Sequence, residues 1–314
     1  MKRNNIIGIV IALSTVALLL GSCHREKPIT SEIGKPLYEI KDGNHPADHA
    51  IYELYKKTGI QTIYNFDPKI AKWDLGALSS SGQYVAPHDN EQATKDNIAQ
   101  NLEYILKDFV DLYPLEFKQK FMPLRIYLCD SIIMNAEAER MVWYGRDHIA
   151  INLYKDGEKD YDQKKVKDPI TKKMVYPPFS SMEEYYAKAT QRMHSILFTY
   201  LSQYRVSWPQ SFLTYCAHMY GENFPVEAEK EPNFDPRSYG FWSYDEMNTF
   251  KYYRAIKEDQ DITDFVERMI GYTEAENLAA MEGFPELKAK YNILRDFIKE
   301  NFNVDLQEIG NKKK

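Results

Sequence analysis

Residues 186–205, YAKATQRMHSILFTYLSQYR, carry the pattern that most constrains the fold. Large apolar side chains recur there at three- and four-residue spacing, which is the period of one buried helix face. These side chains are Met193, Leu197, Tyr200, Leu201 and Tyr204, with Phe198 beside them. The pattern predicts a long helix at the centre of a core. On spacing alone, His194 in this run is a core or rim histidine.

The first residues have the pattern of an export signal. Lys2 and Arg3 precede an apolar run over residues 6–20, which is shorter than the roughly 20 residues of a membrane-spanning helix. The run ends in Leu-Gly-Ser-Cys, which resembles a bacterial lipobox and places the cysteine at Cys23. We therefore predict a lipoprotein signal peptide at 1–22 and a lipid on Cys23. The alternative is an ordinary signal peptide with a chance cysteine.

A polar segment follows, and it is predicted to tether the anchor to the folded body. It covers residues 23–58 and contains Pro and Gly, which are typical of linkers and turns. His45 and His49 have the i, i+4 spacing of a helical metal pair. Pro46 lies between them, so a stable helical face is not expected and neither is a metal there. The body is predicted to cover residues 59–310.

Composition restricts the partners. The net charge is −6, and no basic stretch has the footprint of a nucleic-acid site, so no nucleic-acid partner is expected. The 24 Tyr suit contacts with sugars or peptides, but they suit half-buried structural positions equally well. Besides Cys23, only Cys129 and Cys216 remain. They could form a disulfide or stay as buried thiols, and the sequence leaves both possibilities open.

Hydrophobic periodicity predicts the order of elements. Predicted strands cover residues 60–64, 124–128 and 148–153. Predicted helices cover residues 97–113, 182–201, 212–220 and 287–302. The charge-dense segment at 155–178 has mixed signs and is predicted to be an irregular solvated loop. The order predicts an α+β fold with a small mixed sheet, a central helix and a mostly helical C-terminal half.

Several segments, taken in order, resemble a known family. This family consists of zinc-binding metallopeptidase lipoproteins, which are zincin-like and carry an H-E-x-x-H helix. They are encoded beside TonB-dependent nutrient-import systems of Gram-negative gut-type bacteria. The matching segments are the lipobox, 63–66, 98–112, 126–131, the 193–198 helix, 208–212, 240–244, 263–267 and 288–302. The resemblance covers roughly residues 60–309. It implies a zincin-like fold and an ancestral site that held zinc.

The departure from the family falls on the catalytic helix. In H-E-x-x-H the two His bind Zn²⁺ and the Glu activates a water. Here His194 matches the first His, Ser195 replaces the Glu and Phe198 replaces the second His. General-base help is worth ~10²–10⁴-fold, and a catalytic zinc needs three protein ligands. We expect no catalytic residue and no bound zinc, with His194 and Glu267 as weak metal candidates. If the former zinc cleft has been filled, Phe198 is the residue expected in it.

These observations lead to one principal hypothesis and two alternatives. In the principal hypothesis the chain is a catalytically inactive lipoprotein, anchored by palmitate-type lipid to the outer membrane on its periplasmic or outer face. It binds a peptide or glycan, or assists a TonB-dependent transporter and its ligand-binding lipoprotein. The first alternative is an active zinc metallohydrolase with non-standard ligands such as His194, His218 and Glu267. The second is a purely structural envelope lipoprotein.

Overall fold

The computed structural model describes residues 37–73, 83–87, 92–135, 138–227, 233–244 and 252–312. Residues 1–39 and residues 40–314 form two separate units, and every described helix and strand lies in the second. The predicted signal peptide and Cys23 fall outside the described residues. In the part of the chain that is described, every helix is too short or too polar to span a lipid bilayer.

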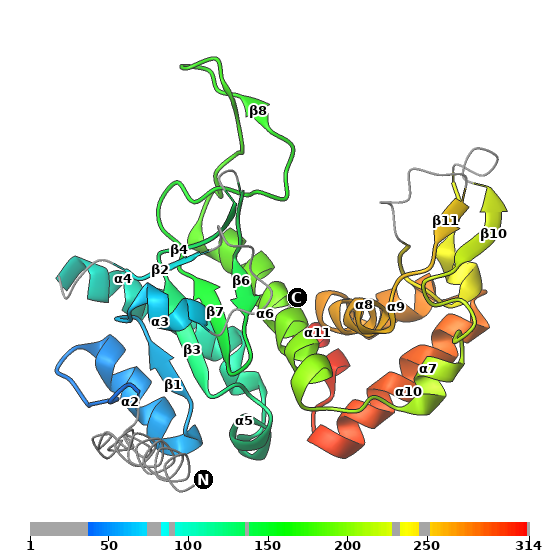
Figure 1. Cartoon of the computed structure of the whole chain (residues 1–314), viewed down its shortest axis with the longest axis horizontal. Coiled ribbons are helices and arrows are strands. Elements are labelled where there is room, and N and C mark those ends of the chain that lie inside the picture. The colour runs from blue at the N-terminus through cyan, green and yellow to red at the C-terminus, as the bar shows by residue number, and fades with distance from the viewer. Residues whose placement is uncertain are drawn as a thin grey trace, which may run out of the picture. The chain divides into compact units, whose positions relative to one another are not determined.

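The largest sheet of the second unit has four strands in the order β1-β3-β7-β6 (Figure 1). They are β1 (Gln61–Ile63), β3 (Arg125–Cys129), β7 (His148–Asn152) and β6 (Val142–Tyr144). The first three strands run parallel, and β6 is antiparallel to β7 at one edge. Apolar residues face each other in register, for example Ile126 opposite Ile149, and both are buried. The predicted α+β class with a small mixed sheet is confirmed.

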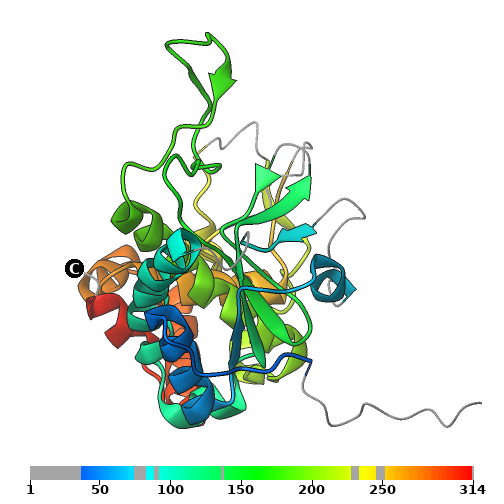
Figure 2. The ribbon, with the colours of Figure 1, turned by 90° about the vertical axis from the view of Figure 1, so that its left-hand side faces the viewer.

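Three smaller sheets occur in the described residues. They are formed by β2 (Gln83–Val85), β4 (Ser131–Asn135) and β5 (Ala138–Glu139), by β8 (Val166–Lys167) and β9 (Met174–Val175), and by β10 (Asn223–Glu227) and β11 (Tyr252–Arg254). The β8–β9 hairpin corrects the prediction of an irregular loop at 155–178. Asp168 closes its turn by accepting a hydrogen bond from the Ile170 amide at 3.0 Å. In Figures 1 and 2 the hairpin projects away from the other strands.

Short helices cover the N-terminal side of the second unit. They are α2 (Pro46–Thr58), α3 (Pro68–Trp73), α4 (Gln92–Asp108), the 3₁₀ turn η1 (Val110–Leu112) and α5 (Leu115–Lys120). The helix predicted at 97–113 is therefore α4 continued by η1. Ile98, Leu102 and Ile105 lie on one face of α4 and are buried in the main core, as their helical spacing requires.

The predicted tether over residues 23–58 is wrong in its last part, because 46–58 form α2. Pro46 stands in the first turn of this helix, where the missing N–H is not needed and the fixed φ is favourable. Gly59 ends the helix at a left-handed φ of 80°. The buried side chains of α2 include Ile51 and Leu54, so the folded body begins before residue 59.

The two histidines around Pro46 face different partners. His45 caps α2 by accepting a hydrogen bond from the Ala47 amide, and its Nε2 lies 3.1 Å from Asp96. His49 is exposed, and its Nδ1 lies 2.9 Å from Asp42. A helical face does exist here, contrary to the prediction, but it does not turn the two imidazoles toward one another.

The C-terminal half is mostly helical, as predicted. It contains α6 (Met182–Tyr204), α7 (Gln210–Thr214), η2 (Pro236–Tyr239), α8 (Glu258–Gly271), α9 (Glu274–Ala280), α10 (Pro285–Phe302) and α11 (Leu306–Lys312). Ser181 caps α6 by accepting from the Glu184 amide at 3.2 Å. α6 packs against β6, β7, α4 and α8 (Figure 1), so the prediction of a central helix is confirmed.

The helix predicted at 212–220 is wrong beyond Thr214, where the chain continues as turns. The aromatic spacing there reflects a small separate cluster, in which Cys216 packs with Phe224 and Phe241. Cys216 and Cys129 are both buried free thiols, which resolves the open question of their pairing.

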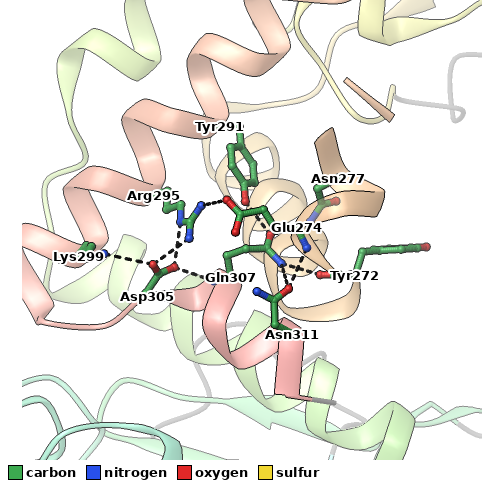
Figure 3. Close-up of polar contacts among 9 residues, drawn as sticks. All are labelled: Tyr272, Glu274, Asn277, Tyr291, Arg295, Lys299, Asp305, Gln307 and Asn311. Carbon is green, nitrogen blue, oxygen red and sulfur yellow. Dashed lines mark hydrogen bonds and ion pairs between the residues drawn. The ribbon is translucent and has the colours of Figure 1, made fainter. Parts of the chain in front are cut away.

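Buried polar contacts join the last helices (Figure 3). The side-chain oxygen of Gln307 accepts hydrogen bonds from Tyr291 at 2.7 Å and from Asn277 at 2.9 Å. Its amide nitrogen donates to the Tyr272 carbonyl at 2.8 Å. Because these partners come from α9, α10 and the end of α8, one fully buried glutamine ties α11 to three neighbouring segments.

Candidate functional site

The face of α6 that carries His194 is turned into the core. The imidazole is fully buried, and its Nε2 lies 3.3 Å from the Asp108 carbonyl oxygen, which can only accept. Nε2 is therefore the protonated nitrogen, and Nδ1 accepts from the Tyr113 hydroxyl at 2.6 Å. The Phe109 ring packs edge-on against it at 5.2 Å. Both nitrogens have protein partners, so His194 is a core histidine.

Phe198 lies on the same buried face, with its ring 6.2 Å from that of Trp208. That Phe198 fills a former zinc cleft stays a prediction, and the cleft described next lies on another face of α6. The α6 residues that line the cleft are Arg192, Ser195 and Ile196. Of the three predicted motif positions, only Ser195 reaches it. None of the cleft-lining residues of α6 is a zinc-ligand type.

The cleft has a volume of about 280 Å³ and is bounded by three segments. They are the stretch 139–143 that includes most of β6, the face of α6 just described, and residues 158–162 with Tyr176 and Asn152. Figure 1 shows β6 at the edge of its sheet, next to α6. Because residues 158–162 line the cleft, this segment belongs to the site.

The outer edge of β6 is open in the described part of the chain. The amide of Gly145 donates to His148 and that of Asn152 to Met141, which sets the alternation of the antiparallel ladder. By that alternation, Val142 and Tyr144 direct their backbone N–H and C=O groups away from β7. No described strand pairs with this edge. The backbone N–H and C=O groups of these two residues are thus available beside the cleft.

Two of the acidic groups in the cleft are neutralised by the chain itself. Lys188 lies 2.6 Å from Asp160 and 2.9 Å from Asp162, and Arg192 lies 3.3 Å from Asp162. Burial would raise the pKa of Asp162, but the hydrogen bonds from Lys188 and Arg192 outweigh it and lower that pKa. These two carboxylates are structural members of the cleft wall.

Glu158 is different. Its side chain is 5% exposed, and burial raises its pKa to about 7, although Lys155 nearby opposes the shift. Glu139 adds to the rise because it is a second negative charge close by. Among the described residues, the one hydrogen bond to the Glu158 carboxylate comes from Asn152 Nδ2 at 3.3 Å. The cleft thus contains a carboxyl that is half protonated near neutral pH.

Two of the segments that resemble the family, 240–244 and 263–267, contact each other. Ser243 Oγ donates to the Asp264 carboxylate, and Gln260 Nε2 donates to it at 2.7 Å. Burial raises the pKa of Asp264 to about 6 against these hydrogen bonds. Trp242 packs on Phe265 with ring centres 5.9 Å apart. These contacts pack the two segments against each other.

The weak metal candidates are not brought together. Glu267 lies 3.9 Å from Arg192, while both imidazole nitrogens of His194 are used in the core. His218 is exposed in the turns after α7. Within the described ranges, no three His, Cys, Asp or Glu side chains are placed to hold a metal ion. The ligand set His194, His218 and Glu267 is therefore not assembled.

Sequence reasoning missed the residues that form the cleft. The charges at 158–162 had the appearance of a solvated loop, yet Glu158 and Asp160 are buried. One signal was present in the sequence: Asn152 is a polar residue at the end of the apolar run His148–Leu153. A polar amide at the end of a buried strand is a signal of a binding site, because pockets often form where strands end.

No protein-family model matches the chain, and no curated protein matches it. Among solved structures, the chain is similar to a protein described as a "putative zinc-binding metallo-peptidase" from Bacteroides caccae ATCC 43185. The identity is 15%, the match covers 85% of this chain and 89% of that chain, and the TM-score is 0.49.

Proposed function

We propose that this chain is an envelope lipoprotein, related to zinc metallopeptidases, that binds an extended peptide without cleaving it. The observation that carries this proposal is the open edge of β6 beside the cleft on α6. A peptide that adds to a sheet edge gains main-chain hydrogen bonds, and its alternate side chains enter neighbouring pockets. Val142 and Tyr144 supply the backbone groups, and the cleft receives the side chains.

The side chains of α6 support binding without hydrolysis. Hydrolysis of a peptide needs an activated nucleophile, such as a metal-bound water or a hydroxyl, thiol or water beside a base. Ser195 stands at the cleft, but His194 directs its two nitrogens to Tyr113 and Asp108 and cannot activate that hydroxyl. Arg192 and Ile196, its neighbours on α6, offer no base, and among the described residues no hydrogen bond joins the Ser195 hydroxyl to a carboxylate of the cleft.

The envelope location is the other part of the proposal. It rests on the lipobox-like residues that end at Cys23 and on the resemblance of the ordered segments to lipoproteins of nutrient-import systems. The chain would then present its cleft beside a TonB-dependent transporter and that transporter's ligand-binding lipoprotein, holding peptide for import.

A backbone substitution tests the role of β6. In Val142→Pro the chain loses one outward N–H while the ladder to β7, which uses residues 141, 143 and 145, keeps its donors. Val142→Ala is the matched control, because it removes the same buried methyl groups and keeps the N–H. Binding is measured by fluorescence anisotropy with a pool of labelled heptapeptides.

We expect Val142→Pro to weaken binding about tenfold relative to Val142→Ala, since one hydrogen bond and its neighbours at the edge are lost. Equal affinity of the two variants would show that the edge is not used. Stoichiometric zinc in the purified protein together with cleavage of the peptides would overturn the proposal that it binds without hydrolysing.

A further inference from the structure

We propose that the inner wall of the cleft is a subsite for an ammonium group of the ligand, such as a lysine side chain, formed by Glu158 and Asn152. This inference deepens the proposed function and rests on it for the kind of ligand. An ammonium group carries three donors and no acceptor, so it requires a site made of acceptors. The cleft has acceptors that the chain does not satisfy itself.

Asn152 provides the first of these acceptors. Its side chain is 1% exposed at the end of β7, and it lines the cleft. Its Nδ2 donates to Glu158, but its Oδ1 is buried without a partner among the described residues. Buried polar atoms are almost always paired, so an orphaned oxygen at a cleft wall indicates a donor supplied from outside the chain.

Glu158 provides the second. Within the described residues, no Lys, Arg or His lies within ion-pair distance of its carboxylate. Lys155, a cation that acts on it from farther away, is held by Asp130. Its ammonium lies 3.2 Å from the Asp130 carboxylate and donates to the Asp130 carbonyl at 2.9 Å. A buried carboxylate without a cation is costly, and a ligand that carries one would relieve the cost.

The other charged groups around the cleft favour an added positive charge. Asp160 and Asp162 are already paired with Lys188 and Arg192. Glu139 lines the cleft and, with Asp130, increases the negative potential at Glu158. Two cations, Arg140 and Lys159, also line the cleft, but both side chains are exposed and neither lies within ion-pair distance of Glu158 among the described residues. The unpaired charge at the buried inner wall is therefore negative, and one ammonium group would match both Glu158 and the Asn152 oxygen.

Ionisation of Glu158 predicts how binding depends on pH. Its pKa is raised to about 7, while a lysine ammonium keeps its proton to about 10. The attraction is therefore full at a pH well above 7 and is lost as the pH falls through 7 and the carboxyl is protonated. Binding of the ammonium releases a proton from Glu158 near neutral pH.

The test compares two labelled heptapeptide pools that are acetylated and amidated at their ends, one with a central lysine and one with a central norleucine. Their affinities for the full chain are measured at about pH 6 and about pH 8. The variants are Glu158→Gln and, as a control with the same change of net charge, Glu53→Gln. Glu53 is paired with Lys56 on the exposed side of α2.

At the higher pH we expect the lysine pool to bind at least about tenfold more tightly than the norleucine pool. At the lower pH this preference should be smaller. Glu158→Gln should abolish the preference and Glu53→Gln should keep it.

If Glu158→Gln keeps the preference while Val142→Pro still weakens binding, this subsite is refuted and the peptide-binding function stands. If neither pool binds, the proposed function itself fails. Displacement of the lysine pool by calcium chloride would show a metal site instead and overturn the inference.

Discussion

Two buried carboxylates of this protein have opposite surroundings. Asp261 on α8 lies 2.5 Å from Lys290 on α10, both side chains are fully buried, and the Tyr220 hydroxyl donates to the same carboxylate at 2.7 Å. Glu158 at the cleft has one hydrogen bond, from Asn152, and no cation at ion-pair distance among the described residues. Burial raises the pKa of both carboxyls, but only Asp261 has a cation at ion-pair distance among the described residues, since Lys155 acts on Glu158 without pairing with it.

The difference separates a structural pair from an open site. Lys290 also donates to the Gly240 carbonyl at 2.9 Å and lies 4.4 Å from the centre of the Phe241 ring, so its position is fully determined. The network around Gln307 in Figure 3 is of the same kind, because its partners are all supplied by nearby helices. Asp261 Oδ1 and Asn277 Oδ1 are also buried without a partner among the described residues, but unlike Asn152 neither residue lines the cleft. The unpaired acceptors at the cleft therefore lie where a group from outside the chain can reach them.

The largest effect is expected from Lys290→Met. It leaves Asp261 buried without its cation, which should lower the free energy of unfolding by about 3–5 kcal/mol. Urea denaturation followed by circular dichroism measures it. The double variant Lys290→Met with Asp261→Leu should recover most of the loss, because no charge is then left alone. If Lys290→Met alone is as stable as the wild type, then Asp261 does not depend on its cation and the contrast with Glu158 fails.

His194→Ala should have the next largest effect. It opens a cavity in the core and leaves the Tyr113 hydroxyl without its acceptor, so a loss of about 2–4 kcal/mol in unfolding free energy is expected. The same preparations are analysed for metal. If the wild type carries zinc that this variant lacks, His194 is a ligand and the active metallohydrolase alternative is favoured.

Glu158→Gln tests the unpaired carboxyl through the pH dependence of stability. The folded pKa, about 7, lies above the ordinary value of 4.5, so the wild type loses stability as the pH rises from 4.5 through 7. The variant does not titrate there. The difference in unfolding free energy between variant and wild type should therefore shift in favour of the variant by up to about 3 kcal/mol as the pH rises from about 4 to about 8. Parallel unfolding curves at all pH values would mean that Glu158 is not buried as a carboxyl.

The smallest effect is expected from His218→Ala. This side chain is exposed in a turn, so stability should change by less than about 0.5 kcal/mol and peptide affinity should stay the same. Thermal unfolding and anisotropy measure both. A loss of affinity would extend the ligand-binding region to the turns after α7.

Much of the fold could be predicted from the sequence because periodicity is a local property. The central helix, α4 with η1, α10 and the three strands of the parallel sheet follow directly from apolar spacing. The helix at 46–58 was missed because a proline was judged as a breaker, although it stands in the first turn where it favours the helix. The turns after Thr214 were missed because their aromatic residues pack in a separate cluster.

The site was less predictable, since it depends on which segments meet. Glu158 and Asp160 have the composition of a solvated loop, and only the contact of that loop with β7 and α6 buries them. The open edge of β6 could not be foreseen either, because three residues give no sign of their place in a sheet.

By itself, the sequence determined that residues 182–201 form a helix with one broad apolar face, because side chains three and four residues apart must share a face. It also determined that no H-E-x-x-H is present there. Only the tertiary structure decided which side of that helix borders the cleft. His194 and Phe198 face the core while Ser195 faces the open edge of β6, and this choice depends on neighbours that lie far away in the chain.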